Sequence, residues 1–96
     1  MNTPADPLGT VERALVHAAR LLEREPALAA EQANEILKIV PDQAQALALS
    51  GLALGRLGKG EEAIGALRRA VHLKPDLPDA WRALADHYSA LDLREA

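Results

Sequence analysis

The sequence contains no cysteine and no phenylalanine, and it has a single tryptophan and a single tyrosine. Without cysteine the chain forms no disulfide and offers no thiolate for catalysis. This absence fits an intracellular protein, and we expect a cytoplasmic location. Since 49% of the 96 residues are apolar but aromatics are scarce, the core must consist mainly of leucine, alanine, valine and isoleucine. Helices rich in alanine have to approach each other closely, because small side chains cannot fill wide gaps.

Positive charge and long apolar runs are also scarce. The formal net charge is −3, so the chain lacks the basic field with which proteins attract nucleic acids or anionic membranes. No apolar run approaches the roughly 18–20 residues of a membrane-spanning helix, and residues 1–9 lack the basic and apolar regions of a signal peptide. We therefore expect a protein or peptide partner, with no nucleic acid and no membrane.

Groups that carry chemistry are few. A nucleophile with an adjacent base is nearly excluded, because the aliphatic hydroxyls number four: Thr3, Thr10, Ser50 and Ser89. The three histidines fall on different predicted helices and show no metal-ligand spacing: His17, His72 and His87. The stretch GRLGKGEE (55–62) lacks the Walker pattern and places two glutamates where a phosphate would bind. We expect no enzymatic activity, no metal site and no cofactor.

Apolar residues recur at three- and four-residue steps along most of the chain, which predicts helices. Residues 1–9 are predicted to form a flexible tail, and Thr10 is expected to cap the first helix. Asp42 and Gln45 resemble a capping box for the third helix. No segment alternates with the period of a strand, so we predict an all-α protein with helices at about 11–24, 26–40, 42–57, 61–73 and 79–91.

The breaks between these helices repeat. The pairs Pro41-Asp42 and Pro75-Asp76 lie 34 residues apart, and the same offset matches Ala29 with Ala63 and Ala46 with Ala80. A helix–turn–helix unit that repeats at this period is the signature of a helical solenoid.

The repeated unit resembles the tetratricopeptide repeat. The middle repeat carries that family's large, small, turn and proline positions at Leu47, Gly51, Leu54, Gly58, Ala63, Leu67, Ala70 and Pro75, and the next unit supplies Trp81, Leu84, Ala85 and Tyr88. The resemblance covers about residues 10–96. It implies a right-handed solenoid of αα-hairpins with about two and a half repeats, at residues 10–43, 44–77 and 78–96, the last incomplete.

Five of the six glycines lie in SGLALGRLGKGEEAIG (50–65). We expect Gly51 to face Ala63 and Ala70 where two helices cross closely, and Gly58 to end a helix in the left-handed conformation. Gly55 is predicted to lie on the concave face, where drift or the close approach of a ligand backbone would explain it. No explanation is evident for Gly65.

The resemblance also implies a binding surface, because the first helix of each repeat lines a concave groove. The predicted groove has an apolar floor and a mixed-charge rim. The first helices of the second and third repeats contribute Gln45, Ala48, Leu52, Gly55, Arg56, Asp79, Arg82, Asp86 and Ser89. The first helix of the first repeat is expected to add Val11, Ala14, Ala18 and Leu21. One subclass of the family grips a C-terminal carboxylate with basic and amide residues, but here those positions hold Ala14, Ala18, Leu49, Asp79 and Ala83. We therefore expect no such clamp.

Two functions from different classes follow. The first is a non-catalytic protein–protein interaction module whose groove binds an apolar peptide or helix. The second is a structural repeat fragment of a longer protein, such as a sulfotransferase-like enzyme, with its catalytic domain elsewhere. A second predicted surface consists of Trp81, Leu84 and Tyr88. We expect these side chains to lack a local partner, because the sequence predicts no neighbouring helix that packs against them. We expect this surface to form a homodimer or to pack on a downstream domain.

Overall fold

A computed structural model describes residues 7–95, and the side chains of residues 9–92. Five helices follow one another: α1 (Pro7–Leu21), α2 (Pro26–Ile39), α3 (Ala44–Arg56), α4 (Gly60–Leu73) and α5 (Pro78–Glu95). The described part of the chain contains no β-strand, and the predicted all-α fold is confirmed.

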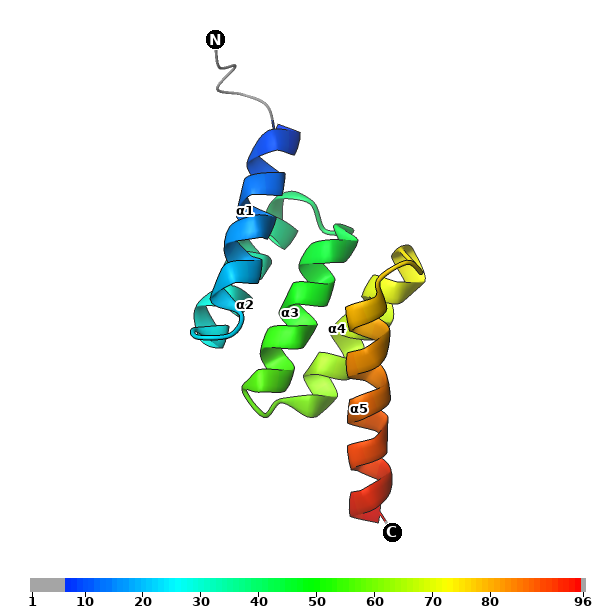
Figure 1. The fold of residues 1–96 in the computed structure, drawn as a ribbon. Coiled ribbons are helices and arrows are strands. Elements are labelled where there is room, and N and C mark those ends of the chain that lie inside the picture. The colour runs from blue at the N-terminus through cyan, green and yellow to red at the C-terminus, as the bar shows by residue number, and fades with distance from the viewer. Residues whose placement is uncertain (1–6, 96) are drawn as a thin grey trace.

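The helices form two layers. Figure 1 shows α1, α3 and α5 side by side at the front, with α2 and α4 behind them. Each helix packs on the next one in the chain, and α3 also contacts α1 and α5. This arrangement is a row of αα-hairpins, in which each unit contacts only its neighbours.

The first helix begins earlier than predicted. Pro7 and Gly9 lie in the first turn of α1, so the predicted flexible tail over residues 1–9 is wrong for residues 7–9, and its remainder lies outside the described residues. Proline suits this position because its fixed φ is helical and the first turn needs no N–H donor. Thr10 consequently lies inside the helix and does not precede it. At the other end α1 stops at Leu21, and a turn leads to Glu25 and Pro26.

The N-terminus of α3 is capped by Gln43. Its Oε1 accepts a hydrogen bond from the backbone N–H of Ala46 at 3.0 Å, so one of the donors that a helix leaves unpaired is satisfied. The predicted capping box of Asp42 and Gln45 is wrong, because the N-cap residue is Gln43. The Asp42 carboxylate instead lies 3.8 Å from the Arg69 guanidinium.

Gly58 ends α3 as predicted. Its φ of +80° is the only positive φ among the described residues. The N–H of Lys59 donates to the Leu54 carbonyl at 2.9 Å, and the N–H of Gly58 donates to the Gly55 carbonyl at 3.1 Å. This pair of bonds is a Schellman motif, which turns the chain directly into α4.

The core lies between α3, α4 and the first half of α5. Leu67 has no exposed surface and is the largest side chain buried to that degree. It lies against Gly51, where an added Cβ would come within 2.6 Å of the Leu67 Cγ and 3.2 Å of the Ala63 carbonyl oxygen. Gly51 therefore permits the expected close crossing, and the three atoms nearest to the added Cβ belong to Leu67 and Ala63. A smaller cluster of Val11, Ile36 and Ala46 joins α1 and α2 to α3.

Candidate protein-interaction surfaces

A hollow of about 300 Å³ lies on the side of α1 and α3, next to the start of α5. We call it the concave hollow. Its lining is mostly apolar and comes from three helices and the loop before α5: Leu15, Val16, Ala19, Gln45, Ala48, Leu49, Leu52, Leu77, Pro78, Asp79 and Ala80. Gln45 and Asp79 are its polar side chains.

Part of the predicted groove lies in the concave hollow. Gln45, Ala48, Leu52 and Asp79 line it, whereas the other five positions predicted on α3 and α5 do not: Gly55, Arg56, Arg82, Asp86 and Ser89. Arg82 lies 3.8 Å from Asp79 in an exposed i,i+3 pair on α5, and Arg56, Asp86 and Ser89 are exposed outside the hollow.

The space beside Gly55 is filled by the chain itself. A Cβ added at Gly55 would come within 2.8 Å of the His87 Nε2 and 3.0 Å of its Cε1. The half-buried imidazole of His87 therefore occupies the place where a ligand backbone was considered. Close approach does explain this glycine, but the approaching group belongs to α5.

The register of α1 differs from the prediction. Leu15, Val16 and Ala19 line the hollow, whereas Val11 and Ala18 are buried. Val11 packs with Ile36 of α2 and Ala46 of α3, and Ala14 packs against the same cluster. The first repeat matches the family pattern poorly, and only its second helix fixed the predicted alignment.

The leucines of the hollow differ in whether they also pack against the main core cluster. Leu52 and Leu77 pack against the main core cluster as well as lining the hollow, whereas Leu49 is half-buried outside either core cluster. Val16 is 53% exposed. Leu49 and Val16 are thus apolar side chains of the hollow whose surface the rest of the chain covers only in part.

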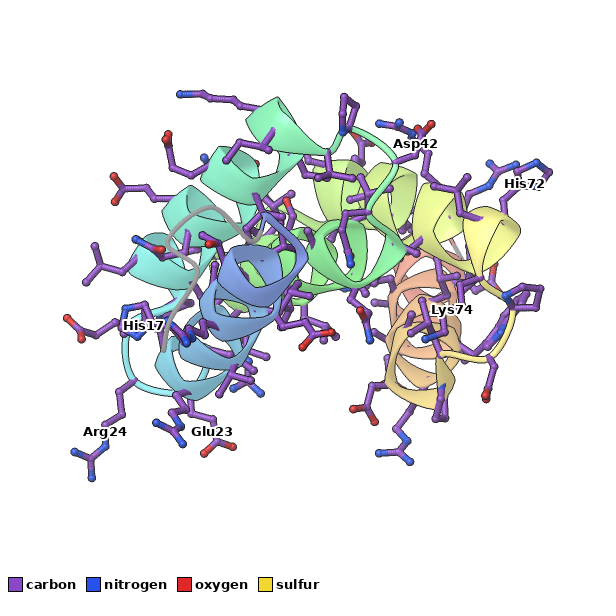
Figure 2. All side chains as sticks on the ribbon, turned by 90° about the horizontal axis from the view of Figure 1, so that it is seen from above. His17, Glu23, Arg24, Asp42, His72 and Lys74 are labelled. Atoms are coloured by element: carbon purple, nitrogen blue, oxygen red, sulfur yellow. The ribbon has the colours of Figure 1, made fainter. Side chains whose placement is uncertain are left out.

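A second, larger concavity of about 1100 Å³ lies between α4 and α5 on the far side from α1. We call it the α4–α5 face. It is lined by Asp42, Gly65, Arg68, Arg69, Val71, His72, Leu73, Pro75, Trp81, Leu84, Ala85 and Tyr88. Figure 2 shows Asp42 and His72 at the same outer edge of the molecule, with His17 at the opposite side.

The three residues predicted for this surface do not share one environment. Trp81 and Tyr88 are exposed, at 51% and 43% of their surface, but Leu84 is 4% exposed and belongs to the main core cluster. The expectation that Leu84 lacks a local partner is therefore wrong, because the first half of α5 already packs on α3 and α4. The indole of Trp81 is held in place, since its Nε1 donates to the Pro75 carbonyl at 2.8 Å.

The basic border of the α4–α5 face was not recognised in the sequence. Arg68 and Arg69 are adjacent in the second half of α4, toward the helix end at which positive charge is favourable. Both line the face. The sequence alone does not show this border, because two consecutive helix residues line the same concavity only when a neighbouring helix bounds it.

The remaining chemistry of the described residues is sparse. No group of three or more histidine, aspartate or glutamate side chains there is placed to hold a metal ion, and no helix within residues 7–95 is long and apolar enough to cross a membrane. On α2, the Glu35 carboxylate accepts a hydrogen bond from the Lys38 ammonium at 2.8 Å and raises the pKa of that lysine. This exposed pair lines neither surface.

Comparison with known proteins finds one family model and a solved structure that resemble the chain. The tetratricopeptide repeat model matches residues 44–87, and no curated protein matches the chain. Among solved structures, a mutant O-GlcNAc transferase from Thermobaculum terrenum matches with a TM-score of 0.79 and 30% sequence identity. The match covers 91% of this chain and 16% of that chain. The chain is therefore a tetratricopeptide-repeat-like protein, with its matched repeat region at residues 44–87.

Proposed function

We propose that the chain is a protein–protein interaction module whose concave hollow binds an apolar segment of a partner. Tetratricopeptide repeats generally mediate such interactions. The observation that carries the proposal is the pair Leu49 and Val16, which line the hollow and keep exposed apolar surface. Covering that surface is favourable at about 25 cal/mol per Å² of apolar area.

The size of the hollow limits what enters it. About 300 Å³ is the low end of the volume range of ligand sites. It accommodates one or two large apolar side chains of a partner segment, and the rest of that segment would run across α1 and α3. Gln45 and Asp79 would then bind backbone or side-chain donors at the border. Because the side chains that grip a C-terminal carboxylate in one subclass are replaced here, we propose an internal segment as the ligand.

The test begins with peptides selected from a display library on the immobilised protein. Their affinities are then measured by fluorescence anisotropy against Leu49→Glu, which puts a charge in the hollow without removing a member of either core cluster. The matched control is Leu28→Glu, because Leu28 is exposed on α2 outside the hollow. We expect Leu49→Glu to weaken binding at least about tenfold, as a charge buried against an apolar group would, and Leu28→Glu to leave it unchanged. Equal effects of the two variants would contradict the proposal.

A second candidate function is that the chain is the repeat region of a longer protein. The observation that favours it is the structural match, in which this chain corresponds to 16% of an enzyme. On this proposal the catalytic chemistry would reside in another domain, and the helices would hold that domain or its partner. Sequencing the native gene tests it directly, since the reading frame either continues into a further domain beyond Ala96 or stops there.

A further inference from the structure

The exposed aromatic residues of the α4–α5 face form one stripe. Trp81, Ala85 and Tyr88 occupy positions i, i+4 and i+7 of α5, which lie on one side of a helix. The stripe runs over seven residues, or about 10 Å at 1.5 Å per residue. Leu73 and Pro75 extend it toward α4. Two turns of a partner helix would cover a stripe of this length.

The border of the face is strongly biased in charge. Arg68 and Arg69 line it from α4, against the single carboxylate of Asp42. Asp42 already lies 3.8 Å from Arg69, and the guanidinium of Arg68 has no ion pair or hydrogen bond with any other described residue. The face therefore offers apolar contact along α5 and unneutralised positive charge along α4.

A second copy of the chain is a poor match to this surface. A two-fold contact uses the same patch on both molecules, so each copy would bring two arginines and one paired carboxylate to the interface. Bringing like charges together opposes such a contact. A partner helix with leucine or alanine along one side and acidic residues along one edge meets both requirements.

The geometry points to an amphipathic helix with an acidic edge as the occupant of the α4–α5 face, with its apolar side on Trp81 and Tyr88 and its carboxylates at Arg68 and Arg69. This helix belongs to a separate partner protein. The α4–α5 face shares no lining residue with the concave hollow.

Two synthetic peptides of about 18 residues serve as probes, because shorter isolated helices are marginal in water. Both carry the same leucine and alanine stripe, and one has glutamate on the flanks where the other has lysine. Neither contains tryptophan, so the emission of Trp81, the one tryptophan of the chain, reports occupancy of the face. We expect the glutamate peptide to bind about tenfold more tightly at low salt, and the difference to shrink as salt screens it.

Charge reversal locates the site. The double variant Arg68→Glu with Arg69→Glu should reverse the preference between the peptides. The matched control is Arg56→Glu with Arg82→Glu, which changes the net charge equally at exposed residues outside the face and should preserve the preference. Trp81→Ala should weaken the glutamate peptide at least about tenfold by anisotropy, as truncation of a central aromatic anchor does. Circular dichroism confirms that each variant is folded.

Several results would overturn the inference. They are equal affinity for the two peptides, binding of neither, and a reversal that the Arg56 and Arg82 control also produces. A concentration-dependent dimer in sedimentation velocity that Trp81→Ala abolishes would assign the face to a second copy instead.

Discussion

The imidazole of His87 lies over the backbone of Gly55, so close that a Cβ at position 55 would be 2.8 Å from its Nε2. The same ring lies near the start of α4, where a Cβ at Gly60 would be 3.7 Å from Nδ1. His87 thus connects α5 to the end of α3 and the beginning of α4. Glycine in the last turn of α3 leaves room for this contact, which offsets the helix propensity that an alanine would provide.

A double-mutant cycle on Gly55 and His87 tests this relationship. In a His87→Ala background, Gly55→Ala should stabilise the protein by about 0.5–1 kcal/mol, the usual gain over glycine in a helix. In the parent, the displaced imidazole should cancel most or all of that gain, so the two changes couple. Urea unfolding followed by circular dichroism measures the four stabilities. Additive effects would show that the ring moves aside without cost.

Gly65 is a helical glycine with which Gly55 can be compared, because no atom lies close to the position of its added Cβ. It lies inside α4, is exposed, and an added Cβ would meet nothing within 4 Å. Gly65→Ala should therefore raise the free energy of unfolding by about 0.5–1 kcal/mol. The structure offers no reason for this glycine, and a loss of stability on substitution would show that one exists. The measurement is again the urea midpoint, with an unchanged slope.

Gly51 should respond in the opposite direction. Leu67 is fully buried and cannot swing away, and the Ala63 carbonyl oxygen stands 3.2 Å from the added Cβ. We expect Gly51→Ala to destabilise the protein by about 1–3 kcal/mol, as overpacking of a core does. Thermal unfolding compared with Gly65→Ala checks the sign, since both changes add the same methyl group to a helix. A stabilised Gly51→Ala would mean that α3 and α4 separate easily.

These glycines also show how far the sequence leads. The 34-residue repeat predicts the helices, the turn at Gly58 and the burial of Leu67, because those features depend on local propensity and on a pattern that recurs. The neighbour of Gly55 was not predictable in this way, since it depends on where α5 crosses α3. The α1 lining of the hollow was predicted one residue out of register at Leu15 and Ala19, where the repeat pattern is degenerate. Burial of Leu84 likewise depends on the angle at which α5 packs.

Two neighbouring side chains at the N-terminus of α3, Gln43 and Asp42, should contribute differently to stability. Gln43→Ala removes the acceptor of the Ala46 N–H and should cost about 0.5–1 kcal/mol, within the range for loss of an N-cap. Asp42→Ala removes an exposed contact to Arg69 at 3.8 Å and should cost less, because exposed pairs contribute about 0–1 kcal/mol. Thermal melts at low and high salt distinguish the two, since the Asp42 effect should fade with salt. A larger cost at Asp42 would restore the capping box predicted from the sequence.

The indole of Trp81 should contribute more to orientation than to stability. Its Nε1–H donates to the Pro75 carbonyl in the loop between α4 and α5, and half of its surface is exposed. Trp81→Phe keeps an aromatic ring but removes the donor, and water can reach the freed carbonyl. The cost should therefore be about 0.5–1 kcal/mol, the net contribution of an ordinary hydrogen bond. Thermal unfolding at 222 nm gives this value without relying on tryptophan emission. A cost of several kcal/mol would mean that the ring is part of the core, and the α4–α5 face would then have no exposed aromatic stripe to offer a partner.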